Sequence, residues 1–405
     1  MRPFDGRRIL LGITGGIASY KSVMVARMLT QAGAEVDVVM TRAAQEFVGA
    51  ITFEAVTGRR VYSEIFGAGN ALDHIRIARD ASVFVVAPAT ADFLARAAHG
   101  LADDLLTAAL LANTSPVLFV PAMNDRMWAN AQTRQNVRQL KKLGYQVLEP
   151  DEGPLAAGEG AGPGRMPEPE TIVAQIAKTL EKKGNLSSLT ILVTAGATRE
   201  AIDPVRFISN HSTGKMGIAI AEAAWRRGAT VKLVAGHVDV PIPDAIPTER
   251  VDDVAQMQRA VSDNLQIADV LIMAAAPADF RPAAAASQKI KKEALKAGRP
   301  EPIELAETED ILRSTIGKRK PGSVVVGFAL ETENLLANSL SKLESKELDM
   351  IVANSAAEEG SGFGGDTNRV TIITRGGLHE NIPLMSKTEV ADVILDRIEE
   401  LMDGR

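Results

Sequence analysis

Apolar runs that stop at small residues or proline constrain the fold of this chain. SVFVVAPAT at 82–90 and PVLFVPAMN at 116–124 are apolar on both faces of an extended strand. The second half repeats the pattern in TILVTAGATRE, from about 189, and in ADVLIMAAAPADFRP at 268–282. Such runs are typical of interior strands in a parallel sheet covered by helices on both faces. Ligands of these sheets bind at the carboxyl ends of the strands, so the loops after the runs are candidate sites.

The order of these runs predicts two domains of the same architecture. The chain opens with an apolar run, a glycine turn, an amphipathic stretch over 18–31 and EVDVVM, which together indicate a β-α-β unit. A second strand–glycine turn–helix pattern follows the polar linker KKGNLSSL. With 405 residues the chain is also long for a single core. We expect an α/β fold with two doubly wound, mainly parallel-sheet, Rossmann-like domains at 1–185 and 186–405, and NRVTIITR at 368–375 closing the second sheet.

Composition narrows the classes of partner. The net charge of −6 and the isoelectric point of about 5.6 disfavour a nucleic acid, which demands clustered basic surface. No apolar run approaches the ~20 residues of a membrane span, and the start MRPFDGRR lacks the apolar segment of a signal peptide. We therefore expect a cytoplasmic enzyme without a membrane partner. The chain has no cysteine, which excludes disulfides, thiolate metal ligands and a cysteine nucleophile.

Two segments, 155–169 and 281–305, lack the regular spacing of apolar residues that marks a helix or a strand. LAAGEGAGPGRMPEP at 155–169 is so dense in glycine and proline that we expect neither helix nor strand there. RPAAAASQKIKKEALKAGRPEPIEL at 281–305 mixes alanine, lysine and proline without a core pattern, and we interpret it as a mobile loop. Elsewhere the pattern predicts a strand at 145–150 and helices over 168–183 and 215–227.

Loops of the first half are expected to meet at one edge of its sheet. GITGGIASYK, MTRAAQEF at 40–47, APATADF at 87–93 and PAMNDRMW at 121–128 all follow strands. Glycines at a helix start let backbone N–H groups approach an anion, although a generic strand–helix turn looks the same. His74, near a helix start, and Asn124 are each, taken alone, more often structural than catalytic.

The motif DPVRFISNHSTGKMG at 203–217 is the richest of the second half. Its STGK is similar to the end of a Walker A loop, but GxxxxGK[ST] requires glycine at 209 and serine or threonine at 216, where this chain has Ser209 and Met216. A P-loop ATPase is therefore rejected. What remains is a Ser/Thr/Gly cluster with a lysine at a helix start, which suits phosphates. The structural alternative is that Ser212 or Thr213 caps the helix.

Taken together, the first-half segments GITGGIASYK, DHI around His74, APATADF and PAMNDRMW resemble the flavin-containing cysteine decarboxylases. The whole chain, in the same domain order, resembles the bifunctional phosphopantothenoylcysteine decarboxylase/phosphopantothenate–cysteine ligases of coenzyme A synthesis. The resemblance implies FMN bound between the subunits of a trimer, with His74 as the active-site histidine and Asn124 holding the substrate carboxylate. The residues it implies at the flavin are Gly15, Gly16, Thr41 and Thr90.

In the second half, DPVRFISNHSTGKMG, AAAPADFRP, KIKK, GFALET, KLESKELDMIVAN and FGGDTNRV resemble successive signatures of the ligase. The resemblance implies that 4′-phosphopantothenate attacks CTP and that cysteine then displaces the nucleotide, giving 4′-phosphopantothenoylcysteine. It implies Mg²⁺ (or Mn²⁺) beside Asp279, Lys289 near the nucleotide and Asn210 on the acyl intermediate. The implied binding residues are Ser212, Thr213, Gly214, Ala275, Ala276, Phe328, Lys342 and Lys346. For the two lysines, a solvated helix face is an equal alternative. Trimers of the first domain joined through dimers of the second would make a dodecamer.

One reactive position departs from the family pattern. Family members carry Ala-Cys-Gly in the loop before Gly-x-Gly-Arg-Met, and that cysteine supplies a proton in the final reduction. Here GPGRM at 162–166 is present, but Ala157 stands where the cysteine belongs, or Gly158 if no residue is inserted. Three interpretations stay open: a natural or engineered replacement, another acid such as Glu159 or a water, or an impaired decarboxylase half that serves the ligase. A flavin-binding regulatory protein is the alternative of a different class.

Overall fold

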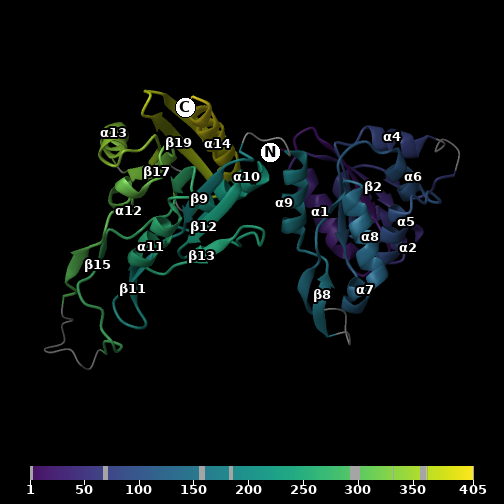
Figure 1. Ribbon diagram of the computed structural model, residues 1–405, viewed down its shortest axis with the longest axis horizontal. Helices are drawn as coiled ribbons and strands as arrows, with labels where there is room; N and C mark the ends of the chain where they lie inside the picture. The colour runs from purple at the N-terminus through teal and green to yellow at the C-terminus, as the bar shows by residue number, and fades with distance from the viewer. Residues whose placement is uncertain are drawn as a thin grey trace. The chain divides into compact units, whose positions relative to one another are not determined.

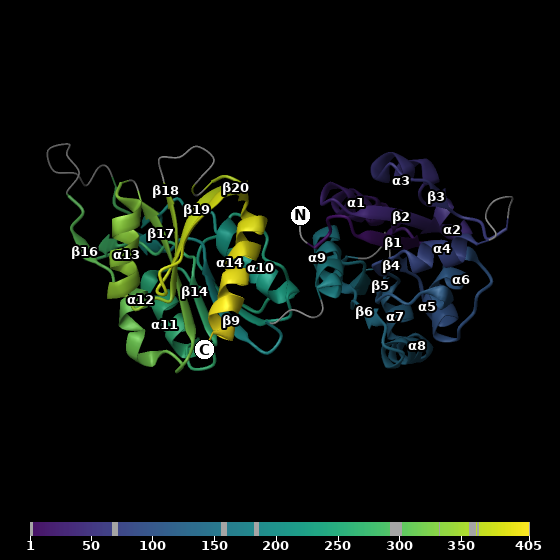
Figure 2. The same ribbon diagram turned by 90° about the horizontal axis from the view of Figure 1, so that it is seen from above.

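The computed structural model describes residues 3–66, 72–154, 160–181, 186–291, 302–331, 333–355, 362 and 364–404. Its internal contacts divide the chain into two compact units, Met1–Lys182 and Lys183–Arg405. The division falls close to the expected boundary after residue 185. Each unit is an α/β sandwich with helices on both faces of a central sheet (Figures 1 and 2). The mixed α/β class with large parallel sheets is thereby confirmed.

The sheet of the first unit consists of parallel strands in the order β3-β2-β1-β4-β5-β6. The order reverses between β1 and β4, which is the topological switch point of a doubly wound sheet. Its strands are β1 Arg8–Ile13, β2 Glu35–Met40, β3 Val61–Tyr62, β4 Val83–Ala89, β5 Val117–Pro121 and β6 Gln146–Val147. The strand expected at 145–150 is thus reduced to two residues.

Two helix layers bury this sheet. Ile9 and Leu11 of β1 face the layer that contains α1, α3 and α9, whereas Leu10 faces α4, α5, α6 and α8. This alternation explains why the strand is apolar on both faces. The helices are α1 Ser19–Gln31, α2 Arg42–Gln45, α3 Ala50–Thr57, α4 Asp73–Arg79, α5 Ala91–Ala98, α6 Leu105–Ala112, α7 Asp125–Ala129, α8 Ala131–Lys142 and α9 Pro169–Leu180.

The second unit repeats the topology of the first and extends it. Its sheet has the order β13-β12-β9-β14-β17-β18-β19-β20, and only the last two strands pair antiparallel. The switch point lies between β9 and β14. The strands are β9 Thr190–Ala195, β12 Thr230–Ala235, β13 Thr248–Arg250, β14 Val270–Met273, β17 Val324–Glu331, β18 Met350–Ser355, β19 Thr367–Thr374 and β20 His379–Ser386.

One expectation for this sheet is wrong: NRVTIITR, which lies within β19 and just beyond it, does not close the sheet, because β20 pairs outside it. β20 escapes a search for apolar runs because Ile382 is its only buried residue. Helices α10 and α14 cover one face of the sheet, and α11, α12 and α13 cover the other. They are α10 Lys215–Arg226, α11 Val254–Asn264, α12 Ile311–Ser314, the 3₁₀ turn η3 Ile316–Lys318, α13 Leu335–Ser345 and α14 Lys387–Asp403.

Three antiparallel ribbons project from the strand ends: β7 Asp151–Pro154 with β8 Ala161–Arg165, β10 Arg199–Ala201 with β11 Phe207–Ser209, and β15 Phe280–Pro282 with β16 Leu305–Glu307. β8 contradicts the expectation that LAAGEGAGPGRMPEP contains no strand. A two-stranded ribbon has only edges, so Pro163 removes no interior hydrogen bond, and the register shifts beside its partner Glu152. The ribbon β15–β16 also lies at the ends of the stretch 281–305, whose residues 292–301 are outside the described ranges.

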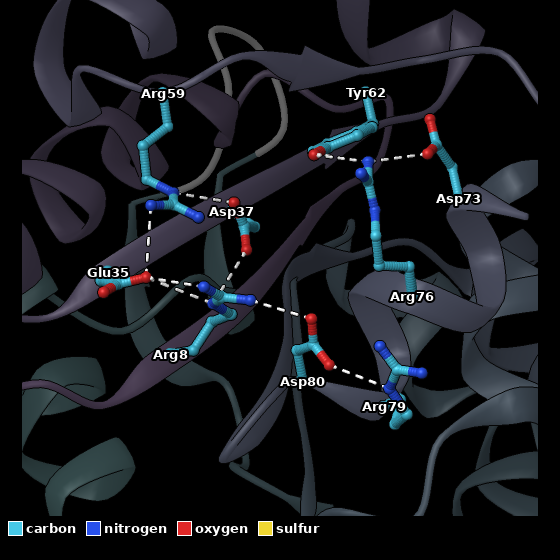
Figure 3. A network of polar contacts seen from close by, with 9 residues as sticks. All are labelled: Arg8, Glu35, Asp37, Arg59, Tyr62, Asp73, Arg76, Arg79 and Asp80. Atoms are coloured by element: carbon cyan, nitrogen blue, oxygen red, sulfur yellow. Dashed lines mark hydrogen bonds and ion pairs between the residues drawn. The ribbon is translucent and has the colours of Figure 1, made fainter. Parts of the chain in front are cut away.

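Charged residues gather at the amino-terminal edge of the first sheet (Figure 3). Arg8 at the start of β1 pairs with Glu35 at 2.9 Å and with Asp80 at 3.0 Å. Asp37, whose side chain is buried in β2, is held by Arg59 at 2.8 Å. Because a buried carboxylate needs a partner, these contacts tie β1, β2 and the end of α4 together at the edge opposite the candidate loops.

No described helix has the length and hydrophobicity of a bilayer span.

Candidate functional sites

The loops after β1, β2 and β4 meet at the switch point of the first sheet. The hydroxyl of Thr14 donates to the carbonyl oxygen of Pro88 at 2.7 Å and accepts from the backbone N–H of Thr90 at 3.1 Å. The backbone N–H of Thr41 donates to the carbonyl oxygen of Ile13 at 3.0 Å. The structure therefore brings the glycine loop, Thr41 and Thr90 to one place, as the strand order requires.

The glycine loop fits an anion at the start of α1. A Cβ on Gly15 would lie 2.5 Å from the Cβ of Ala43, whereas the nearest contact at Gly16 would be Thr90 at 3.8 Å. No side chain caps α1, whose N-cap is Ala18. Uncapped N–H groups at a helix start are hydrogen-bond donors for a phosphate. The N–H groups of Ser19 and Lys21 already donate to the carbonyl oxygens of Gly16 and Ala18, so the predicted phosphate contact depends on the other N–H groups of the loop and on the open space at Gly16.

Thr41 and Thr90 each cap the helix that follows. The Thr41 hydroxyl accepts from the backbone N–H of Ala44 at 3.2 Å, and the Thr90 hydroxyl accepts from that of Phe93 at 3.3 Å. Both hydroxyls remain able to donate their hydrogen, since a hydroxyl is donor and acceptor at once. Helix capping by itself explains why threonine stands at both positions. It does not prevent either hydroxyl from donating to a flavin, so that role stays a prediction.

Asn124 lies in the loop after β5, beneath the ribbon β7–β8. Its Oδ1 accepts from the backbone N–H of Arg126 at 2.9 Å, while its Nδ2 has no hydrogen-bond partner among the described residues. The ribbon docks on this loop through glycine: a Cβ on Gly164 would lie 2.2 Å from the carbonyl oxygen of Met123, and one on Gly162 would lie 3.0 Å from Asp125. The glycines of GPGRM therefore permit a close approach. Ala157 lies between β7 and β8 in the sequence and is outside the described residues.

His74 occupies the first turn of α4. Its Nδ1 is buried and has no hydrogen-bond partner among the residues that the structure describes. Its neighbour Asp73 is buried and pairs with Arg60 at 3.0 Å and with Arg76 at 2.8 Å. No hydrogen bond between described residues joins His74 to the switch-point loops, so within one chain the histidine is not linked to them. A buried imidazole nitrogen without a partner suits a bound molecule or a neighbouring subunit.

A cleft of about 460 Å³ lies at the carboxyl edge of the second sheet. It gathers ten of the residues that the sequence indicated for the second half: Asn210, Ser212, Thr213, Gly214, Ala275, Ala276, Asp279, Phe328, Lys342 and Lys346. Lys289 is not among the lining residues and is exposed on the segment before residue 292. Asp203 contacts that segment at one point, where its Oδ2 accepts from the backbone N–H of Ile290 at 3.2 Å.

Backbone hydrogen bonds shape the floor of the cleft. The N–H of Ala276 donates to the carbonyl oxygen of Gly196 at 2.8 Å, and that of Ala275 to the hydroxyl of Thr194 at 3.1 Å. The Nδ2 of Asn210 donates to the carbonyl oxygens of Ala276 at 3.3 Å and Pro277 at 2.9 Å. The amide hydrogens of Asn210 are thus engaged with the strand end, which holds the amide against the floor.

The structural alternative, in which Ser212 or Thr213 is the N-cap of the next helix, is wrong. The N-cap of α10 is Gly214, with φ of +76° and no side-chain cap. A side chain at Gly214 would approach Val238 at 2.4 Å, so both the backbone conformation and the space demand glycine. The result is a second uncapped helix start that lines a site, as in the first unit.

The lysines predicted to hold phosphate each have a carboxylate partner. Lys342 lies 2.7 Å from Glu331, and Lys346 lies 2.9 Å from Asp310. Burial acts to raise the pKa of the Glu331 carboxyl, but the hydrogen bonds from Lys342 and Asn338 outweigh it and hold that pKa below its ordinary value. Both lysines line the cleft, so neither is only a solvated face.

Several lining residues escaped the sequence reading, above all Asn354, Asn368 and Lys387. Lys387 opens α14, and the SxxE capping box of Ser386 and Glu389 signals only that a helix starts there. No local pattern places that helix start at the cleft, because β19 and β20 bring it there. Among the described residues, no three histidine or carboxylate side chains are grouped closely enough to hold a metal ion by themselves. Asp279, the predicted metal ligand, is an exposed carboxylate in the cleft wall.

Comparison with known proteins identifies the family. Residues 2–181 match the family described as Flavoprotein, and residues 186–402 match the DNA/pantothenate metabolism flavoprotein C-terminal domain. The coenzyme A biosynthesis bifunctional protein CoaBC of Vibrio vulnificus is 42% identical over 404 residues, which are 99% of this chain and 100% of that protein. The chain belongs to the CoaBC family. The CoaBC of Bacillus subtilis is 42% identical over 98% of both chains.

A crystal structure of a CoaBC C-terminal domain is 39% identical to this chain, covers 54% of it and 98% of that domain, and has a TM-score of 0.46. Within this CoaBC family member, the switch-point loops belong to the Flavoprotein half and the cleft belongs to the C-terminal half. The two strand-end sites therefore correspond to the two halves of a bifunctional protein of coenzyme A biosynthesis.

Proposed function

We propose that this protein converts 4′-phosphopantothenate and cysteine into 4′-phosphopantetheine by two reactions. Residues 186–405 ligate the two substrates at the cost of CTP, and residues 1–185 decarboxylate the product, 4′-phosphopantothenoylcysteine, with FMN. The observation that carries the proposal is the cleft, which collects ten of the residues that the family resemblance implied for the second half. Membership of the CoaBC family along almost the whole chain supports the pairing of the two reactions.

In the ligation, the carboxylate of 4′-phosphopantothenate attacks the α-phosphate of CTP, which forms an acyl-cytidylate and releases pyrophosphate. The amine of cysteine then attacks the acyl carbon and CMP leaves. Carboxylate and triphosphate repel each other, so the reaction calls for Mg²⁺ (or Mn²⁺), which Asp279 would help to hold and which would offset their charge. Asn210, fixed against the strand end, orients the acyl group. Lys289 reaches the nucleotide when its segment closes on the cleft.

In the decarboxylation, a bound FMN supplies the oxidation of the cysteinyl thiol and the later return of the electrons. Gly15 and Gly16 hold its phosphate, and the hydroxyls of Thr41 and Thr90 donate to it. Asn124 holds the substrate carboxylate through Nδ2, which has no other partner among the described residues. His74 exchanges a proton at the substrate, because an imidazole can both donate and accept a proton.

The loop position without a cysteine bears on the last proton transfer. We propose that the decarboxylase works with a slowed final reduction, because alanine at 157 has no proton to give and Glu159 or water replaces the thiol poorly. The protein acts in the cytoplasm as a homo-oligomer, with trimers of the first domain and dimers of the second. Two alternatives stand: a ligase whose decarboxylase half is impaired, and a flavin-binding regulatory protein.

The ligase is tested by pyrophosphate release. Release from CTP that requires both 4′-phosphopantothenate and cysteine, and stops when EDTA removes the divalent cation, supports the proposal. ATP and GTP in parallel give the nucleotide preference. If no nucleotide releases pyrophosphate, the ligase function proposed for residues 186–405 is wrong. The flavin-binding regulatory protein is then the remaining alternative.

The decarboxylase is tested with 4′-phosphopantothenoylcysteine while the flavin spectrum and the product mass are followed. Slow multiple turnover to 4′-phosphopantetheine supports the proposal. A product two mass units lighter, with persistently reduced flavin, would instead indicate that the final reduction is blocked. No carbon dioxide release at all would favour the impaired decarboxylase.

A further inference from the structure

One wall of the cleft carries three carboxylates. Asp279 lies in the loop after β14, Glu309 and Asp310 lie between β16 and α12, and all three line the cleft. Asp310 is already engaged, because its Oδ1 accepts from the backbone N–H of Arg313 at 3.2 Å and its Oδ2 lies 2.9 Å from Lys346. Burial acts to raise the pKa of the Asp310 carboxyl, but these contacts outweigh it and hold that pKa below its ordinary value. Asp310 therefore serves the fold, and the other two carboxylates remain for ligands.

Glu309 extends from a backbone that is fixed to the strand end. The N–H of its neighbour Thr308 donates to the carbonyl oxygen of Asp279 at 2.9 Å, and the Thr308 hydroxyl donates to that of Ala278 at 2.5 Å. The side chain of Glu309 is exposed, and no hydrogen bond or ion pair joins its carboxylate to any residue that the structure describes. Its place is thus set by the backbone, while its charge is available to a ligand in the cleft.

Asn210 is held by the same strand end. Its Nδ2 donates to the carbonyl oxygen of Pro277 at 2.9 Å, two residues before Asp279. An extended chain advances at most ~3.6 Å per residue, so the Cα atoms of Pro277 and Asp279 lie within about 7 Å of each other. Asn210, which we propose orients the acyl group, and Glu309 therefore reach the cleft from neighbouring points of one wall.

The second step of the proposed ligation needs a group that receives a cation. The α-amino group of cysteine is largely protonated at neutral pH, but it attacks the acyl carbon only with a free electron pair. The lysines that line the cleft repel an ammonium group, whereas a carboxylate attracts it and can take its proton. Glu309 meets this need at the wall where Asn210 is held.

We infer that Glu309 binds the ammonium group of cysteine beside the acyl-cytidylate and accepts its protons as the amide forms. The ammonium loses one proton to the Glu309 carboxylate, which passes it to water, and the free amine attacks the acyl carbon. The bond from carbon to nitrogen forms, the bond from that carbon to the phosphate oxygen breaks, and CMP leaves with the electron pair. The nitrogen releases its second proton to the same carboxylate. The inference rests on the proposed ligase function and adds to it the residue that receives the second substrate.

The test compares wild type with Glu309→Gln in the full chain, because glutamine keeps the size of the side chain and removes its charge. Exchange of labelled pyrophosphate into CTP, with Mg²⁺ and 4′-phosphopantothenate but no cysteine, measures the first step alone. We expect this exchange to stay within about two-fold and kcat/KM for cysteine to fall about ten-fold or more, the usual weight of a hydrogen bond to a charged group. Glu307→Gln, on the same segment but outside the cleft lining, is the matched control and leaves both unchanged.

Hydroxylamine separates binding of the ammonium group from other roles of Glu309. It is uncharged at neutral pH and converts acyl-nucleotides into hydroxamates, so Glu309→Gln should form the hydroxamate at the wild-type rate. Glu309→Asp keeps the charge on a shorter side chain and should recover part of the activity with cysteine.

Three results would overturn the inference while the ligase function stands. An equal loss with cysteine and with hydroxylamine would place Glu309 at the acyl group, and a loss of pyrophosphate exchange would place it at the divalent cation. An unchanged kcat/KM for cysteine would leave Glu309 without a part in the reaction. If wild type shows pyrophosphate exchange with none of CTP, ATP and GTP, the ligase function fails and takes the inference with it.

Discussion

The backbone N–H of Met123 donates to the carbonyl oxygen of Gly164 at 3.0 Å, which joins the loop of Asn124 to the ribbon β7–β8. The same two residues leave no room for a side chain, because a Cβ on Gly164 would lie 2.2 Å from the carbonyl oxygen of Met123. Two segments more than thirty residues apart in sequence are therefore held in register at the first candidate site.

We expect Gly164→Ala to lower decarboxylation at least ten-fold and to leave ligation unchanged. Its φ of +154° and the close carbonyl cost a side chain about 1–3 kcal/mol, enough to undock the ribbon. Carbon dioxide release and CTP-dependent pyrophosphate release measure the two reactions separately. Gly49→Ala is the control, since its Cβ would meet Ile51 at an ordinary 3.7 Å. Equal loss of both reactions would argue against a local effect on the ribbon.

Ala157→Cys is expected to accelerate the final reduction, because it returns a proton-donating thiol to the reactive loop. The measurement is the ratio of 4′-phosphopantetheine to the product two mass units lighter, together with reoxidation of the flavin. Gly158→Cys serves as the control for the alignment without an inserted residue. An unchanged ratio in both variants would mean that the loop no longer delivers a proton to the substrate.

The interior strands β1, β4, β5, β9 and β14 could be predicted from the sequence, because interior parallel strands are apolar on both faces. The edge strands β8 and β20 could not be predicted, because they depend on a partner strand and a docking surface more than on their own composition. The same division holds for the cleft. Asn210 and Ala275 lie in motifs that the family resemblance indicated, whereas Lys387 reaches the cleft only through the antiparallel strands β19 and β20.

Asp203 should control the segment that bears Lys289. The hydrogen bond from the Arg206 side chain, with backbone N–H groups, holds the pKa of the Asp203 carboxyl well below its ordinary value. A carboxyl with a depressed pKa stabilises the fold above its unfolded pKa and loses that contribution as pH falls through the folded pKa. The segment 286–291 is thus expected to stay anchored at pH 4–5, where unperturbed carboxyls begin to protonate.

Asp203→Asn is expected to remove this anchor at neutral pH. Proteolytic cleavage within 281–305 should become several-fold faster, and the KM for CTP should rise with little change in the decarboxylase. Limited proteolysis between pH 4 and 7 and steady-state kinetics measure both effects. Asp263→Asn, on the exposed face of α11, is the control. Cleavage at the wild-type rate would show that Asp203 does not hold the segment.

The buried ion cluster between α10 and α14 should dominate the stability of the second unit. Asp392, 3% exposed, pairs with Arg226 and lies 3.0 Å from Arg227. Removing one partner of a buried pair leaves an uncompensated charge, so Asp392→Asn should lower the free energy of unfolding by about 3–5 kcal/mol.

Trp225 of α10 reports this transition in urea, on a Trp128→Phe background, because the chain has only two tryptophans. Asp103→Asn in the first unit is the control, as its exposed carboxylate is screened by solvent. A shift in the midpoint equal to that of the control would contradict a dominant role for the cluster.

The absence of cysteine from the whole chain determines how this protein can react with its thiol substrate and product. Cysteine and the thiol product that we propose are nucleophiles that exchange with protein thiols and disulfides. A chain without thiols forms no mixed disulfide with either, at any ratio of oxidised to reduced thiol in its surroundings. Oxidative stress therefore reaches this protein through its methionines and its substrates, and added reductant protects the substrates alone.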